Sequence, residues 1–280
     1  MQVKTADLKR LLEVTSRKQF VNAKPQQQVI GCVIRPWGGS TSTGHTAKTT
    51  SLVRDGKTSL AQFSMDCDWE EHEDAIVVPD IERLLGVLSA HGGEATLTQD
   101  GGSLRIKSKG KQTTLVAEPG SLAFPHTQET IAQWEEKSMS LAEQIDATAP
   151  SYKMRDGSER TEFFCADTGS SLLHEALKAD NINAQKLNQY QFIHDGSNTL
   201  SVRVGTDLKG ETHTILNEEC PYDEAFESVY EGGLEQVLAH YDGLVSLCFL
   251  DFRPEGQGIR LIARFDNDDW VFQAAVLKRV

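Results

Sequence analysis

The sequence lacks a long apolar run: no stretch approaches the roughly 18 consecutive apolar residues of a membrane-spanning helix. Its first ten residues, MQVKTADLKR, also lack the apolar core of a secretory signal peptide. Hydrophobic residues make up 39% of the chain and the mean hydropathy is −0.39, values that are typical of a soluble globular protein. We therefore expect a cytoplasmic protein without a membrane partner.

Cysteine is scarce and irregularly placed. The five cysteines stand at positions 32, 67, 165, 220 and 248, and none belongs to a CxxC pair. This spacing favours reduced thiols in the core over a metal site or a disulfide. The stretch DCDWEEHED at 66–74 places six carboxylates around His72, and we interpret it as a solvated loop in preference to a metal site. No metal and no cofactor are expected.

Basic residues are outnumbered by acidic ones. The net charge of −13 argues against a classical basic nucleic-acid binder. The first 20 residues differ, because five basic residues there face only Asp7 and Glu13. A small basic region on an acidic body can still attract a polyanion locally.

Motifs of common enzyme classes are also lacking. The sequence has no GxSxG, no HExxH and no GxGxxG between a strand and a helix. The segment GSTSTGHT at 39–46 resembles a phosphate-binding loop, but His45 stands where that motif has lysine, and no helix pattern follows. We therefore predict that the chain is not an enzyme; an acid–base enzyme with scattered residues is the remaining alternative.

What the sequence does contain is a repeated amphipathic helix. DLKRLLEV at 7–14 returns as DIERLLGV at 80–87 with five of eight positions identical. Leucine or isoleucine at i, with leucines at i+3 and i+4, indicates an apolar stripe in each, and Asp7 is expected to cap the first helix. Two further helices are predicted at 170–179 and 232–243, with stripes that include Leu172 and Tyr241.

Short strand patterns follow each helix, whereas the Gly/Ser/Thr-rich stretch 37–50 is interpreted as a loop. Residues 119–160 hold three of the eight prolines and are interpreted as a connector. The predicted organisation is therefore a domain at 1–118, a connector at 119–160 and a domain at 161–280. The fold class is α+β, with two similar domains that each pack two helices on antiparallel sheets.

The segment at 80–120, DIERLLGVLSAHGGEATLTQDGGSLRIKSKGKQTTLVAEPG, resembles the DNA sliding clamps of tailed phages. The element order and the closing GIRLIARFDNDDWVFQAAVLKRV also resemble proliferating-cell nuclear antigen. The resemblance implies the DNA-clamp fold and a homotrimeric ring that encircles duplex DNA without reading its sequence. It implies a bacteriophage processivity factor, present in the host cytoplasm, that tethers a DNA polymerase and is opened by an ATP-dependent clamp loader.

In such a ring the helices line the hole, so their off-stripe cations are the residues expected to face DNA. These candidates are Lys9, Arg10, Arg17, Lys18, Arg83, His174 and Lys178. The alternative is that they belong to ordinary solvated helix faces. Arg105, Lys107, Lys109 and Lys111 are spaced two apart, which predicts one strand face directed away from the helices, with Leu104 and Ile106 directed toward them.

Clamp partners dock a short peptide under the connector and beside the last strand. The resemblance assigns this pocket to Leu122, Phe124, Phe272, Ala274, Ala275 and Val276. The alternative is that these residues show the ordinary alternation of core residues in an edge strand and form no pocket. Subunits are expected to join by pairing 111–118 with 211–219 of a neighbour. A different function, that of a clamp-like monomeric processivity factor or transcription-coupling adaptor, remains an alternative to the ring.

Overall fold

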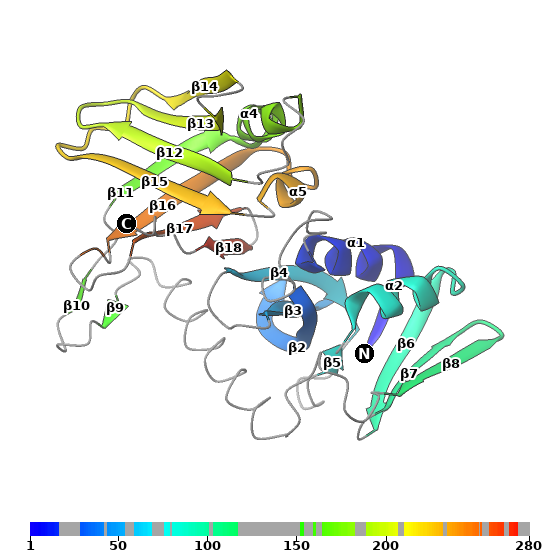
Figure 1. Ribbon diagram of the computed structural model, residues 1–280. Coiled ribbons are helices and arrows are strands. Elements are labelled where there is room, and N and C mark those ends of the chain that lie inside the picture. Colours follow the sequence, from blue (N-terminus) through cyan, green and yellow to red (C-terminus); the bar gives the residue numbers. More distant parts are fainter. Residues whose placement is uncertain are drawn as a thin grey trace. The chain divides into compact units, whose positions relative to one another are not determined.

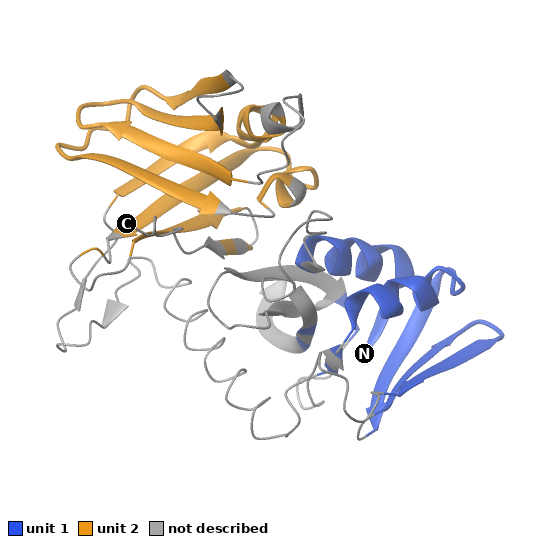
Figure 2. Ribbon diagram, viewed as in Figure 1, with its two compact units in different colours: residues 1–18, 24–56, 60–142 blue, residues 19–23, 57–59, 143–280 orange. Residues whose placement is uncertain are grey.

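Two compact units make up the computed structural model of the 280-residue chain (Figure 2). Unit 1 comprises residues 1–18, 24–56 and 60–142, and unit 2 comprises 19–23, 57–59 and 143–280. The structure describes residues 1–16, 29–41, 44–53, 59–68, 76–78, 80–100, 103–116, 152–153, 159–160, 164–182, 189–206, 210–231, 234–251, 253, 258–265 and 269–273. No described helix is long and apolar enough to cross a membrane.

Unit 1 is built from two successive repeats of strand, helix and three strands (Figure 1). The first repeat comprises β1 (Gln2–Lys4), α1 (Thr5–Ser16), β2 (Val29–Thr41), β3 (Gly44–Val53) and β4 (Ser59–Cys67). The second comprises β5 (Ile76–Val78), α2 (Ile81–Leu88), β6 (Glu94–Asp100), β7 (Ser103–Ser108) and β8 (Lys111–Val116).

The two repeats of unit 1 exchange their first strands. β1 of the first repeat pairs with β6 of the second, where Val3 lies opposite Ala95. β5 of the second repeat pairs with β2 of the first, where Val77 lies opposite Val33. The resulting strand orders are β1-β6-β7-β8 and β5-β2-β3-β4, and the pairings between these strands are antiparallel. Each small sheet therefore contains strands from both repeats.

Unit 2 repeats this plan. Its first repeat comprises β11 (Phe164–Gly169), α4 (Ser170–Ile182), β12 (Gln189–Asp195), β13 (Leu200–Thr206) and β14 (Gly210–Asn217). Its second comprises β15 (Ala225–Glu231), α5 (Leu234–Leu238), β16 (Leu244–Asp251), β17 (Ile259–Arg264) and β18 (Trp270–Gln273). The strand orders are β11-β16-β17-β18 and β15-β12-β13-β14, so the first strands are exchanged here as well. β9 (Tyr152–Lys153) and β10 (Glu159–Arg160) pair as a separate two-stranded hairpin.

The helices are held by their apolar stripes, as predicted. In α1 the side chains of Leu8, Leu12 and Thr15 are fully buried. The buried Thr15 hydroxyl donates to the carbonyl of Leu11 at 2.7 Å, which satisfies it inside the core. α1 packs beside α2 and against β2 and β3. The prediction of an α+β chain with two helices on antiparallel sheets in each half is confirmed.

The two copies of the repeated helix begin differently, and the predicted cap of the first is wrong. Asp80 caps α2, because its Oδ1 accepts from the backbone N–H of Arg83 at 2.9 Å. α1 instead begins at Thr5, so Asp7 lies inside its first turn. Thr5 is fixed by tertiary contacts: its backbone N–H and its hydroxyl both donate to the carbonyl of Gly93.

Three further expectations are corrected. The predicted loop at 37–50 contributes to the β2–β3 hairpin, with Trp37 opposite Thr46, because a threonine-rich stretch suits a pleated strand. The fourth helix is much shorter than predicted, since α5 covers only five residues. Leu172 is 41% exposed and does not belong to the buried stripe of α4.

The described core of unit 2 contains a cluster of aromatic rings. Phe192 and Tyr230 are fully buried, with ring centroids 5.9 Å apart. His194 is buried in the same cluster. The backbone N–H of Gly196 donates to His194 Nδ1 at 3.1 Å, and His194 Nε2 lies 3.0 Å from the carbonyl of Cys220. The ring proton of His194 is therefore on Nε2. We therefore assign His194 a structural role.

Candidate nucleic-acid interface

Among the described helices, α1 carries the most cations. Arg10 is exposed and Lys9 is half-buried, and both lie off the buried stripe. Lys4, exposed at the end of β1, directly precedes the helix. Asp7 and Glu13 are exposed on the same helix, so the cations are interspersed with carboxylates. Arg17 and Lys18 lie outside the described residues.

α2 offers one cation, Arg83, beside the exposed Glu82. The Arg83 side chain extends toward the sheet, where its Nη1 donates to the carbonyl of Val116 at the end of β8. That hydrogen bond is long, at 3.4 Å, and the side chain is solvent-exposed, so the contact is weak. Arg83 is therefore available to an incoming anion at the cost of one weak bond.

α4 carries His174 and Lys178 one turn apart. The pKa of His174 is lowered from its usual 6.5, mainly by desolvation and secondly by the Lys178 ammonium, while Glu175 opposes the shift. His174 is therefore neutral at neutral pH and supplies no charge to a phosphate there. Lys178 is exposed and is the cation that α4 offers at neutral pH.

The charge balance of the helices is close to neutral. The four helices in the described part of the chain together contain four Lys or Arg residues and six carboxylates. α5 contributes Glu235 and no cation. Any attraction of a polyanion to these helices is consequently weak and concentrated on α1, which is the uneven distribution that the sequence predicts.

The basic segment 105–111 divides between two faces, which corrects the prediction of one shared face. Arg105 and Lys107 are exposed on the face of β7 opposite the buried Leu104 and Ile106. The two-residue turn that follows places Lys111 opposite Ser108, on the helix side of the sheet. The sequence indicates this reversal through the Lys-Gly pair at 109–110, since Gly110 adopts φ 75°.

Lys111 is a cation on the helix side that sequence analysis missed. Its Nζ donates to the carbonyl of Ala90 at 2.7 Å, just beyond the C-terminal end of α2. A cation is favourable there because the last carbonyls of a helix carry partial negative charge. The adjacent His91 is buried and spans β7 and β8, with its Nδ1 2.8 Å from Ser108 Oγ and its Nε2 2.9 Å from Thr113 Oγ1.

Of the predicted peptide pocket, only one position falls within a described element. Phe272 lies in β18 opposite Ile262 of β17. The other candidates, Leu122, Phe124, Ala274, Ala275 and Val276, lie outside the described residues. The pocket therefore stays a prediction.

The strands predicted to join subunits stand at sheet edges. β8 is the last strand of β1-β6-β7-β8, and β14 is the last strand of β15-β12-β13-β14. Val116 at the end of β8 is 53% exposed and Ile215 in β14 is 50% exposed. Exposed apolar residues on an open strand edge favour pairing with another strand.

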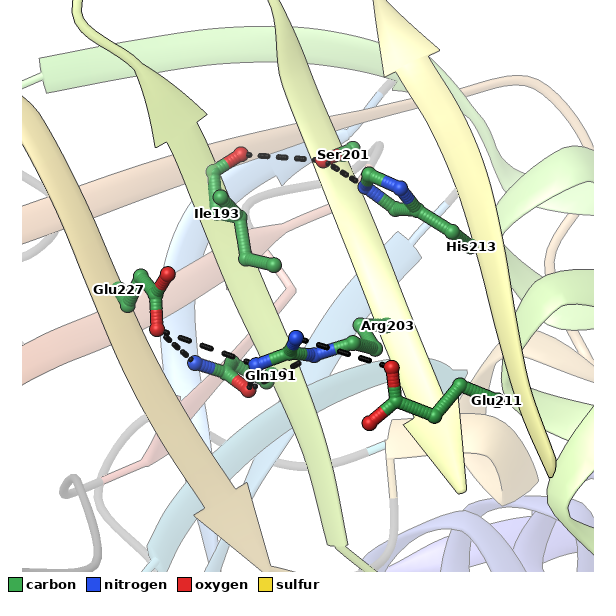
Figure 3. A network of polar contacts seen from close by, with 7 residues as sticks. All are labelled: Gln191, Ile193, Ser201, Arg203, Glu211, His213 and Glu227. Carbon is green, nitrogen blue, oxygen red and sulfur yellow. Dashed lines mark hydrogen bonds and ion pairs between the residues drawn. The ribbon is translucent and has the colours of Figure 1, made fainter. Parts of the chain in front are cut away.

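The exposed face of the β14 sheet carries a polar network around Arg203 (Figure 3). The Arg203 guanidinium donates twice to Gln191 Oε1 and lies 3.7 Å from Glu211 and 3.8 Å from Glu227. Gln191 Nε2 in turn donates to Glu227 at 2.6 Å. Because two carboxylates surround this single guanidinium, the network ties the four strands together and does not attract phosphate.

Ser201 and His213 on the same face resemble a nucleophile–base pair, with Oγ and Nε2 2.6 Å apart (Figure 3). The Ser201 hydroxyl, however, donates to the carbonyl of Ile193 at 3.4 Å and is nearly buried. Ser201 is only 4% exposed, so a substrate has little access to its hydroxyl, whereas an activated serine must be reachable. The pair is a structural contact.

No protein-family model matches the sequence, and no curated protein matches it. Solved structures do match. The β sliding clamp of Caulobacter crescentus has 14% sequence identity and a TM-score of 0.63, and the match covers 100% of this chain and 66% of that chain. The DNA polymerase sliding clamp of Pseudomonas aeruginosa has 14% identity and a TM-score of 0.62, covering 99% and 66%. That of Bacillus subtilis has 11% identity and a TM-score of 0.63, covering 100% and 64%.

The chain thus spans about two thirds of the length of the sliding clamps that it matches. At such low identity the likeness concerns the fold. The expected DNA-clamp fold is confirmed over the whole chain.

Proposed function

We propose that the chain is a DNA sliding clamp, a non-enzymatic processivity factor whose subunits form a ring around duplex DNA and tether a DNA polymerase. The observation that carries the proposal is the fourfold repeat with exchanged first strands, which matches sliding clamps over the full chain. Cations concentrated on α1 support weak phosphate contacts that allow sliding. The net charge of −13 supports an acidic remainder that repels DNA.

Two of the edge strands support a ring. β8 in unit 1 and β14 in unit 2 are unlike edges of their sheets. Pairing of unlike edges between copies is a head-to-tail interface, which either closes into a ring or grows into a filament. We propose closure by three copies, as the resemblance to proliferating-cell nuclear antigen implies.

Side-chain pattern also selects a register for this interface. Leu115 pairs with the buried Leu104 and lies on the helix side of its sheet, whereas Val116 lies on the opposite side. In β14, Leu216 is buried and Ile215 is exposed. An antiparallel pairing that places Val116 opposite Ile215 also places Leu115 opposite Leu216, so the apolar residues meet on both faces.

Loading by an ATP-dependent clamp loader, a phage origin and a location in the host cytoplasm are further parts of the proposal. They are supported by the resemblance of 80–120 to tailed-phage clamps. Partner peptides would dock beside β18, near Phe272, as the resemblance implies. The clamp itself would need no metal and no cofactor.

Two measurements test the proposal. Light scattering of the purified chain should give three times 31.0 kDa, about 93 kDa. With cognate loader and ATP, the protein should remain on nicked circular DNA and leave when the circle is linearised, because a ring is held by topology. A monomer that still stimulates a DNA polymerase would favour the monomeric processivity factor. Equal retention on circular and linear DNA would refute encirclement.

A further inference from the structure

Two cysteines lie directly opposite each other on adjacent strands of unit 2. Cys165 of β11 and Cys248 of β16 are registered partners in an antiparallel pair, and their Sγ atoms lie 2.6 Å apart. Directly opposed residues in such a pair have Cα atoms about 4.5–5.5 Å apart, which lies within the roughly 4.4–6.8 Å that a disulfide spans. A bond between these sulfurs therefore requires no movement of the strands.

The next pair along the strands confirms that side chains meet on this face. Asp167 lies opposite Ser246, and the Ser246 hydroxyl donates to Asp167 Oδ1. Cys165 and Cys248 precede and follow that pair by two residues, so they share the same face. The cysteine contact thus belongs to a continuous row of paired side chains.

The two thiols differ sharply in exposure. Cys165 is exposed, whereas only 2% of Cys248 is exposed. Ile262, the partner of Cys248 on β17, is fully buried as well. A dissolved oxidant can therefore reach the Cys165 sulfur, while the Cys248 sulfur is accessible to Cys165.

We propose that a hydroperoxide oxidises Cys165 and that Cys248 then closes a reversible cross-strand disulfide. The Cys165 thiolate attacks the peroxide, the O–O bond breaks, and a sulfenic acid forms while hydroxide leaves. The Cys248 sulfur then attacks the sulfenic sulfur, the S–O bond breaks, the S–S bond forms, and water leaves. With hydrogen peroxide, two thiols and one peroxide give one disulfide and two waters. A dithiol reductant reverses the reaction by thiol–disulfide exchange.

The bond would fasten the exchanged strand of unit 2. β11 belongs to the first repeat and β16 to the second, so the disulfide would link the repeats covalently across a sequence separation of 83 residues. Closing a long loop restricts the unfolded chain and so stabilises the folded one. The modification would make the fold more resistant to unfolding under oxidising conditions, whether or not the chain acts as a clamp.

The test uses the full chain with hydrogen peroxide as the probe. Peptide mass spectrometry without reductant should find a Cys165–Cys248 peptide in oxidised wild-type protein. The melting temperature should rise by roughly 5–10 °C, and dithiothreitol should return it to the starting value. Cys165→Ser and Cys248→Ser should each abolish the linked peptide and the shift, whereas the control Cys67→Ser should retain both.

The order of events is tested by trapping. In Cys248→Ser, a sulfenic-acid probe should label position 165, while in Cys165→Ser the buried Cys248 should remain a thiol. The mapping of wild-type protein does not depend on whether the variants fold. The proposal is refuted if oxidised wild-type protein contains Cys165 as sulfinic or sulfonic acid with no link to Cys248. It is also refuted if peroxide oxidises Cys248 first.

Discussion

Replacing Ile215 by Asp should dissociate the proposed ring while each subunit stays folded. Ile215 lies on the edge strand β14 and is 50% exposed, so about half of its side chain still has water to lose. Fully burying such a side chain stabilises by about 1.5–3 kcal/mol, so half-burial on assembly contributes on the order of 1 kcal/mol. Val116 of the neighbouring subunit, 53% exposed, contributes a similar amount.

Asp at this position removes the apolar contribution of Ile215, deprives Val116 of its contact, and places a carboxylate against an apolar strand. The interface should lose at least about 2 kcal/mol, or roughly 30-fold in dissociation constant. A concentration series in light scattering or sedimentation measures this as a shift of the dissociation midpoint. Unfolding of the monomer should change by less than about 0.5 kcal/mol, because the site is exposed in the single chain.

Leu244→Asp is the matched control. Leu244 is 65% exposed but begins β16, which lies inside its sheet between β11 and β17. The variant should keep the oligomer mass.

The proposed register adds a sharper test, since Val116→Lys combined with Ile215→Asp should restore part of the affinity through an opposite-charge pair. An unchanged mass in Ile215→Asp, or equal dissociation in Leu244→Asp, would contradict the proposed interface.

Three other predictions follow from the described residues. Lys9→Glu with Arg10→Glu should weaken DNA binding and lower the slope of log affinity against log salt by about 2 per subunit, measured by fluorescence anisotropy. Gly86→Ala should stabilise the chain by about 0.5–1 kcal/mol in urea unfolding, because Gly86 is a helical residue where a Cβ meets nothing within 4 Å. The lowered pKa of His174 means that the unfolded chain binds its proton more readily, so stability should fall as pH drops below about 6.5, and His174→Gln should remove that part of the loss.

The first two of these predictions each have a control variant in the chain, and the third has a pH comparison. Arg105→Glu with Lys107→Glu changes the same charge on the sheet face away from the helices, and should reduce DNA binding less than the α1 variant does. Gly110→Ala places a Cβ in equally open space but at φ 75°, where an L-residue is strained, and should destabilise the chain by about 1–2 kcal/mol. For His174, identical urea curves of wild type and His174→Gln at about pH 7.5 and about pH 5.5 would contradict the cited shift.

Elements whose signal is local could be predicted from the sequence. The helix stripes follow from the spacing of apolar residues alone, and β6 at Glu94–Asp100 follows from the alternation of apolar and polar residues between flanking glycines. Sequence analysis missed β1, β11 and β15, which each open a repeat, and the short β9 and β10 inside the predicted connector. β1 has only three residues and β9 and β10 have two each, so their alternation is too short to detect.

Candidate functional residues also divide into those that a local pattern predicts and those that depend on a turn or on a distant contact. Lys9 and Arg10 could be chosen because a helix pattern defines which of its residues lie off the buried stripe. Lys111 was predicted on the wrong face of the sheet. In an unbroken strand it would share a face with Arg105, but the two-residue turn at 109–110 makes Lys111 the partner of Ser108, on the opposite face. The contact between Cys165 and Cys248 could not be anticipated, since 83 residues separate the two cysteines.

The amino-acid sequence alone therefore determines the repeating order of amphipathic helices and strands. Hydrophobic residues recur with a period of 3.6 in a helix and 2 in a strand, and each period is visible within a single segment. Which strands pair with each other is not settled by this local spacing. β1 and β5 in unit 1, like β11 and β15 in unit 2, leave their own repeat and complete the sheet of the other. Hydrogen bonds between distant strands decide this, since each short first strand needs a partner edge that only the assembled fold supplies.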